Sequence, residues 1–155
     1  MQQYQVISNS EPALDLWARV MRTRNILYKT FARELLSLDI KPEQLGILNL
    51  LQKANGVVTP VSICRLYCRE PQTISVDLRR LEAKGLIRLI KDLARKNMIR
   101  VVITAEGVSV WERGTRKTHA INQVFNVLSQ EETSQLGLII DKLADSGLQV
   151  YSSGV

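Results

Sequence analysis

Apolar residues recur at helical spacing over most of the chain. Between residues 11 and 38 two apolar stripes run along one long predicted helix. The first stripe holds Leu14, Trp17, Met21, Tyr28, Phe31 and Leu35, and the second holds Leu16, Val20 and Leu27. A helix that is apolar on more than one face must be covered on more than one face. In a chain of 155 residues, a partner subunit is the expected cover.

Three shorter helices are predicted next, and each has a proline near its start. Proline is well tolerated in the first turn of a helix, where its missing N–H leaves no intrahelical bond unmade. The three prolines are Pro42, Pro60 and Pro71. The second and third helices should span residues 60–67 and 72–84.

A β-hairpin is predicted after these helices. Residues 86–90 and 99–103 are rich in β-branched and other apolar side chains, and residues 91–98 between them are polar and basic. The chain therefore reads as mainly α, with one small hairpin that has a charged tip.

Two further helices are predicted at the C-terminal end. Thr104 can cap the first, and its apolar residues continue as far as Leu128. The last begins at the capping-box sequence from Ser129 to Glu132, and we expect Gly147 to end it.

Positive charge is concentrated in the middle of the chain. The net charge is +6 and the sequence pI is about 9.6. Residues 60–104 alone hold ten basic and four acidic side chains, whereas residues 105–155 hold four basic and six acidic ones. Such a patch suits a polyanion such as nucleic acid. The alternative is an ordinary solvated basic surface.

The sequence offers no catalytic constellation and no metal site. It lacks the phosphate-binding, dinucleotide-binding and zinc-protease motifs, and it has a single histidine, His119. Cys64 and Cys68 have no second cysteine pair, so they predict small buried apolar side chains rather than a zinc framework. We therefore expect no enzyme activity and no cofactor; whether the cysteines have a redox role stays open.

The predicted location is the cytoplasm. No apolar run approaches the ~20 residues that a membrane span needs. The first residues lack a basic start followed by an apolar stretch, so they do not predict a secretory signal.

The order of elements carries the functional prediction. A short helix, a tight proline-containing turn, a second helix and a basic hairpin are typical of a winged helix-turn-helix, in which the second helix enters the DNA major groove. With Ile74, Leu78 and Leu81 facing inward, the side chains that remain to meet DNA are Gln72, Thr73, Ser75, Val76, Arg79 and Arg80. At the hairpin tip, Arg95 and Lys96 can reach a minor groove or phosphates. The alternative is an amphipathic helix with a solvated charged face.

Three stretches resemble the MarR family of winged-helix regulators, and the resemblance covers residues 12–146. The recognition-helix pattern of the family ends in L-E-K-K-G-L, and residues 81–86 read L-E-A-K-G-L. Residues 103–107 fit the family's L-T-x-x-G after the wing, and residues 128–132 fit its L-S-x-E-E. The family's wing often reads D-x-x-D-R-R, whereas Asp92 is followed by Arg95, Lys96 and Asn97 here, and Val76 replaces a common arginine.

The resemblance implies a homodimer with interlocked terminal helices that acts on a palindromic operator, commonly as a repressor. It also implies release of DNA by a small, often aromatic effector, whose site the sequence does not indicate. One domain over residues 1–155 is expected, with a DNA-binding lobe at 40–104 and dimerisation helices at 11–38 and 105–147. The alternative is a winged-helix module that binds protein partners and does not regulate through DNA.

Overall fold

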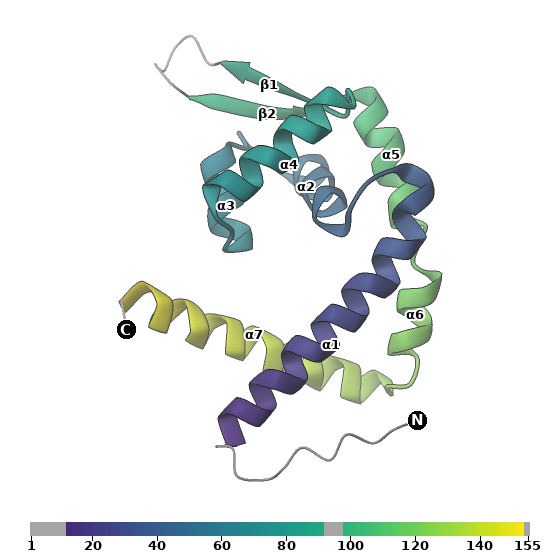
Figure 1. The fold of residues 1–155 in the computed structure, drawn as a ribbon, viewed down its shortest axis with the longest axis vertical. Helices are drawn as coiled ribbons and strands as arrows, with labels where there is room; N and C mark the ends of the chain where they lie inside the picture. The colour runs from purple at the N-terminus through teal and green to yellow at the C-terminus, as the bar shows by residue number, and fades with distance from the viewer. Residues whose placement is uncertain (1–11, 92–97, 154–155) are drawn as a thin grey trace. The chain divides into compact units, whose positions relative to one another are not determined.

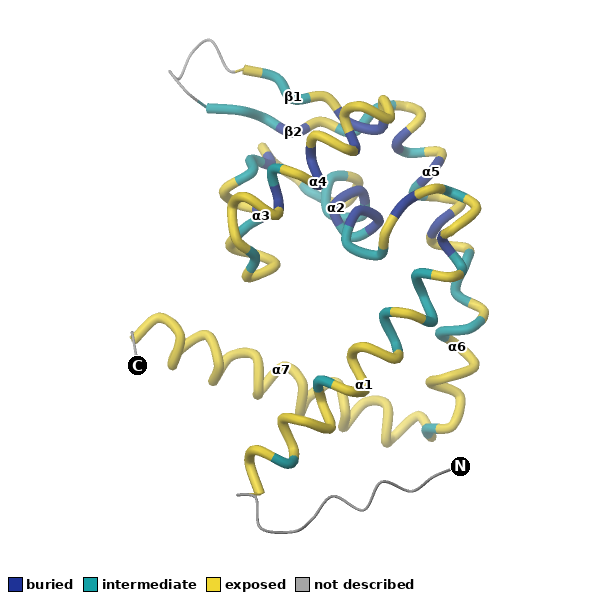
Figure 2. Tube along the Cα trace, viewed as in Figure 1, coloured by how far each residue is buried: buried dark blue, intermediate teal, exposed yellow. Residues whose placement is uncertain are grey.

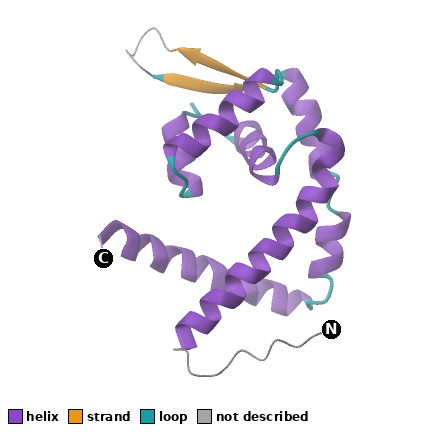
Figure 3. Cartoon of the chain, viewed as in Figure 1, coloured by secondary structure: helices purple, strands orange, loops and turns teal. Residues whose placement is uncertain are grey.

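The fold was examined in a computed structural model, which describes residues 12–91 and 98–153. It is mainly helical with one two-stranded hairpin (Figures 1 and 3). The elements in chain order are α1 (Pro12–Leu35), the 3₁₀ turn η1 (Leu36–Leu38), α2 (Pro42–Lys53), α3 (Pro60–Tyr67), α4 (Pro71–Ala83), β1 (Ile87–Lys91), β2 (Ile99–Ile103), α5 (Ala105–Thr115), α6 (His119–Phe125) and α7 (Gln130–Ser153). The expected fold class, a winged helix-turn-helix of mainly α composition, is confirmed.

The chain divides into two compact units, residues 1–118 and 119–155. The first unit has the apolar core, which gathers on α2, α4 and the base of the hairpin (Figure 2). Its fully buried side chains include Leu48 of α2, Ile63 of α3, and Ile74 and Leu81 of α4. The core therefore fixes the helices on which the predicted DNA-binding residues lie.

The hairpin is antiparallel, and its strands match the predicted runs closely. Its register pairs Ile87 with Ile103 at the base and Lys91 with Ile99 at the outer end. The main-chain N–H of Val101 also donates to the carbonyl oxygen of Val58 at 2.9 Å. This bond attaches β2 to the segment that leads into α3.

Thr104 joins the two ends of the hairpin to α5. Its hydroxyl donates to the carbonyl oxygen of Gly85 at 2.7 Å, and its main-chain N–H donates to that of Leu86 at 3.1 Å. As the predicted N-cap, its hydroxyl oxygen also accepts from the N–H of Gly107 at 3.0 Å. One threonine thus holds the entry and exit of the wing together and starts the next helix.

The predicted single helix from Thr104 to Leu128 is wrong. It is two helices, α5 and α6, which are separated by residues 116–118. Gly114, in the last turn of α5, has low helix propensity, and its carbonyl oxygen accepts from the N–H of Lys117 in a tight turn at 3.0 Å. The apolar periodicity continues across this break, which is why the pattern alone did not reveal it.

The expected end of the last helix at Gly147 is also wrong. The helix begins as predicted, with reciprocal bonds between Ser129 and Glu132 at 2.8 and 3.1 Å, but it continues to Ser153. A glycine ends a helix by adopting a positive φ, and among the described glycines only Gly85 does so, at +70°. Gly147 is instead an interior residue of α7.

Large apolar side chains are exposed on both α1 and α7. Trp17 of α1 is 60% exposed, and no residue in the described part of α7 is buried. The exposed apolar residues of α7 are Leu136, Leu138, Ile139, Ile140, Leu143, Leu148, Val150 and Tyr151. Among the described residues, no helix has the length and apolar character that crossing a membrane requires.

Candidate nucleic-acid interface

The turn between α3 and α4 is built by local caps at each side. At the start of α3, the N–H of Ser62 donates to the hydroxyl of Thr59 at 3.2 Å, and the Ser62 hydroxyl accepts from the N–H of Thr59 at 2.9 Å. At its end, Cys68 adopts a left-handed conformation with φ +47°, and Pro71 then opens α4. The helix-turn-helix predicted from these prolines is confirmed.

The inward face of α4 is as predicted. Ile74, Leu78 and Leu81 are almost completely buried in the core of the first unit. Because a helix advances about 100° per residue, the face directly opposite carries Gln72, Val76 and Arg79. These three side chains are exposed, and they follow one another at i, i+4 and i+7. They form the outward stripe of α4.

The other predicted contacts on α4 lie on its two flanks. Ser75 is half-buried on one flank. Thr73 and Arg80 are exposed on the other, and Arg80 lines a hollow together with Lys41 and Gln44 at the start of α2. The six predicted residues of α4 thus divide into an outward stripe of three and a flanking set of three.

A buried polar network fixes α4 against α2. Asp77 is 5% exposed and receives a hydrogen bond and ion pair from Arg69 at 3.1 Å. Its other oxygen accepts from the side-chain amide of Gln44 at 3.4 Å, and the Gln44 oxygen accepts from the N–H of Lys41 at 3.1 Å. The network connects the start of α2, the turn before α4, and α4 itself.

The sequence reasoning missed Asp77, although the sequence contains a signal for it. Asp77 falls on the same helical face as Ile74, Leu78 and Leu81. An acidic residue on an apolar face must find partners, because a buried carboxylate without them is unfavourable by several kcal/mol. Its partners, Arg69 and Gln44, come from different elements and could not be identified from spacing.

The base of the wing presents two exposed basic residues, Arg88 and Lys91, both on β1. The two contacts that the sequence predicted at the wing tip, Arg95 and Lys96, lie outside the described residues.

Two tyrosines tie neighbouring helices to α2. The Tyr67 hydroxyl at the end of α3 donates to the carbonyl oxygen of Gly46 at 2.8 Å, and burial raises the pKa of this phenol. The Tyr28 hydroxyl of α1 donates to the carboxylate of Glu43 at 3.0 Å. Burial, and then the hydrogen bond and negative charge of Glu43, raise the pKa of Tyr28.

The expectation that both cysteines are buried is correct only in part. Cys64 is half-buried and packs against the core, whereas Cys68 is exposed. Cys68 ends α3 rather than lying within it, because it is the left-handed residue of the turn. Its exposure therefore follows from its role as a cap.

No protein-family model matches the chain, and no curated protein matches it in sequence. Its fold is nevertheless shared with solved regulators. The organohalide-sensing regulator RdhR, with 2,4-dichlorophenol bound, is 25% identical with a TM-score of 0.84, over 97% of this chain and 91% of RdhR. Its ligand-free form gives the same identity and TM-score. The MarR-family regulator Sco5413 from Streptomyces coelicolor is 18% identical with a TM-score of 0.79, over 90% of this chain and 98% of Sco5413. The chain is a MarR-type winged-helix protein.

A further MarR-type structure includes nucleic acid. S. aureus MepR, solved as a complex with DNA, is 25% identical with a TM-score of 0.74, over 84% of this chain and 97% of MepR. These similar proteins are transcriptional regulators, which supports a DNA-binding regulator as the function of this MarR-type chain.

Proposed function

We propose that this protein is a homodimeric, non-enzymatic transcriptional regulator that represses by occupying a palindromic operator and leaves it when a small-molecule effector binds. The observation that carries the proposal is the outward stripe of α4. Gln72, Val76 and Arg79 stand exposed on a helix whose opposite face is buried, after a tight turn and before a hairpin. Glutamine and arginine make two-point contacts with base edges, and a valine methyl group suits the methyl group of thymine.

The flanking residues suit the DNA backbone. Thr73, Ser75 and Arg80 lie to the sides of the stripe, where hydroxyls and a guanidinium would meet phosphates. We assign the same role to Arg95 and Lys96, together with a possible reach into the minor groove. Base reading would then rest on few side chains, and the phosphate contacts would fix the register.

Selection of bound sites from a random DNA pool tests this proposal most directly. We expect a palindromic site whose halves lie about one helical turn apart. Binding should weaken steeply with added salt, with a slope of about −0.9 per phosphate neutralised. If no duplex binds at low salt and a protein partner binds in a salt-insensitive manner, the protein-interaction alternative replaces the regulator.

Replacing Arg79 by alanine should weaken binding to the selected site by about 1–3 kcal/mol and relax the base preference at one position. The reason is its central position on the exposed face of α4. Gel shifts of the selected and mismatched duplexes measure both effects. The matched control is Arg116→Ala, because Arg116 is an exposed arginine that follows α5, outside the 40–104 lobe. Equal affinities for the two variants would remove Arg79 from the interface.

The dimer is proposed to form through the segments 11–38 and 105–147, extended along α7 to Ser153. The support is the exposed apolar surface of α1 and α7, since soluble proteins rarely leave such surface uncovered. Along α7, Leu136, Ile140 and Leu143 lie on one side, and Gly147 lies among them. A glycine at this place leaves room for a neighbouring helix to approach closely.

Changing Ile140 to aspartate should shift the protein to monomers at micromolar concentration, because a charge buried in an apolar interface costs several kcal/mol. The control is Gln149→Asp, which places the same charge on the opposite side of α7. Sedimentation velocity gives the oligomeric state, and circular dichroism verifies that both variants stay folded. A dimer of unchanged stability in the Ile140 variant would rule out this face as the interface.

A further inference from the structure

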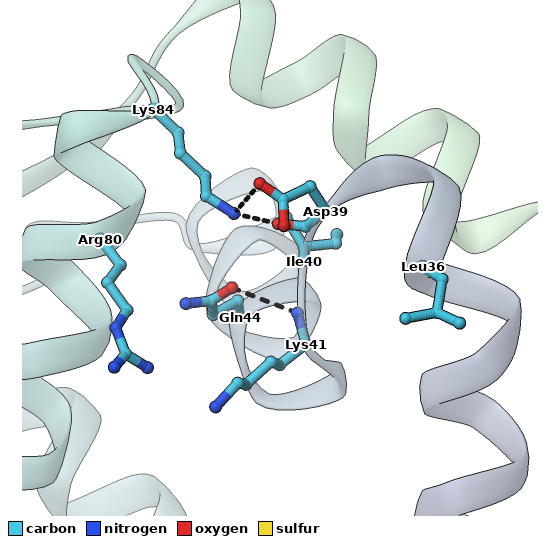
Figure 4. Close-up of a pocket in the computed structure, with 7 residues that line it drawn as sticks. All are labelled: Leu36, Asp39, Ile40, Lys41, Gln44, Arg80 and Lys84. Atoms are coloured by element: carbon cyan, nitrogen blue, oxygen red, sulfur yellow. Dashed lines mark hydrogen bonds and ion pairs between the residues drawn. The ribbon is translucent and has the colours of Figure 1, made fainter.

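A hollow of about 490 Å³ lies within the first unit, where the end of α1, the start of α2 and the C-terminal half of α4 meet (Figure 4). Nothing in the fold or in the base-reading role of α4 requires it. It is separate from the outward stripe, because Gln72, Val76 and Arg79 do not line it.

The wall of the hollow is predominantly cationic. Lys41, Arg80 and Lys84 line it, with Asp39 as the one acidic residue. Asp39 is already used, since its carboxylate pairs with the Lys84 ammonium at 2.8 Å and its carbonyl oxygen also accepts from that ammonium. Within the described part of the chain, the side chains of Lys41 and Arg80 make no hydrogen bond or ion pair. Two cationic groups are therefore available to a ligand.

The polar floor of the hollow is fixed rather than free to adapt. Gln44 is 2% exposed, and its side chain is bonded at both ends, to the N–H of Lys41 and to Asp77. The start of α2 adds the positive end of a twelve-residue helix. The nearest acidic group of that first turn, Glu43, accepts a hydrogen bond from Tyr28 and does not line the hollow.

One side of the hollow is apolar. Leu36, in η1, is 74% exposed, and Figure 4 shows its side chain across the hollow from Arg80. Ile40 lies between them and is almost buried. A cationic wall opposite an apolar wall suits a ligand that has an anionic group on an apolar body, because such a ligand would satisfy both.

The geometry points to a binding site for a small organic anion, such as an aromatic carboxylate, with its charged group between Arg80 and Lys41 and its apolar part against Leu36. A bare phosphate would use the cations and leave the apolar wall uncovered. The anion would hold the Arg80 guanidinium through charge-assisted hydrogen bonds. Resting on the function proposed above, this occupancy lowers DNA affinity, because Arg80 is then unavailable to the DNA backbone.

Titration of the DNA-free protein with 1-naphthoate tests the site, with calorimetry for affinity and backbone amide shifts for location. We expect the largest shifts at Lys41, Gln44 and Arg80. The Arg80→Gln and Lys41→Gln variants should each bind 1-naphthoate about tenfold more weakly, the effect of one lost charge-assisted bond. The matched control is Arg79→Gln, which removes the same charge one residue away, outside the hollow, and should leave naphthoate affinity unchanged.

Two further ligands define the chemistry. Neutral 1-naphthamide should bind about tenfold more weakly than 1-naphthoate, and inorganic phosphate should bind more weakly than either. Equal binding of the amide, equal binding by the Arg80→Gln variant, or shifts confined to other residues would overturn the site. The coupling is read separately, as a loss of duplex affinity on addition of 1-naphthoate that the Lys41→Gln variant does not show. If the protein binds no duplex at all, the regulator proposal fails while the DNA-free titration still decides the site.

Discussion

The variant Gly107→Ala should lose about 3 kcal/mol of unfolding free energy, the upper part of the range for an overpacked core. A Cβ atom at this position would lie 2.0 Å from the carbonyl oxygen of Leu86 and 2.8 Å from a side-chain carbon of Ile103. The oxygen belongs to the main chain and accepts the N–H of Thr104, so it has little freedom to retreat. The methyl group would push α5 away from the base of the wing.

Denaturant unfolding of each variant at one protein concentration measures this effect. Two other glycines calibrate it. At Gly114 a new Cβ would meet the flexible end of Leu45 at 2.6 Å, so we expect a smaller loss than at Gly107. At Gly137 nothing lies within 4 Å, and alanine should stabilise α7 by roughly 0.5–1 kcal/mol through helix propensity. Equal stability of the Gly107 and Gly137 variants would mean that α5 does not pack on the wing base as described.

The second large effect is expected for Asp77→Ala, at about 2 kcal/mol of unfolding free energy. The change leaves the buried amide of Gln44 without its partner and the Arg69 guanidinium without its carboxylate. Removing one member of a fully buried pair costs more, but Arg69 remains partly exposed to water, which reduces the loss. DNA binding should weaken as well, because this network sets the position of α4 against α2.

The matched control is Asp15→Ala, which breaks an exposed ion pair with Arg19 at 2.8 Å. Exposed pairs of this kind contribute less than about 1 kcal/mol. A double-mutant cycle between Asp77 and Arg69 isolates their coupling from the loss of the Gln44 bond. A cost for Asp77→Ala no greater than that for Asp15→Ala would show that the network does not hold α4.

Local signals in the sequence predicted the helix starts well, because each depends on residues a few positions apart. The capping box at Ser129 and Glu132 and the proline at residue 71 mark helix starts that the structure confirms. The same local reasoning failed at Gly147, where a residue with no steric neighbour simply continues the helix. A glycine ends a helix only if its backbone adopts the left-handed conformation, and composition does not decide that.

Part of the candidate interface was predictable, and part was not. The inward face of α4 followed from its apolar period, so the outward residues followed by subtraction. The division of those residues between the outward stripe and the flank that carries Arg80 needed the position of α2. The hollow beside Arg80 combines η1, α2 and α4, and the sequence gives no pattern that brings residues 36, 41 and 80 together.

The sequence by itself determined the order of helices and hairpin, the inward side of α4 and the concentration of positive charge around it. These depend on periodicity, caps and composition, which act over a few residues. Tertiary structure alone decided why Gly107 follows Thr104 at its fixed spacing, which partners satisfy Asp77, and where Arg80 lies. Those features depend on contacts between elements that are far apart in the chain, and such contacts are set by packing in three dimensions.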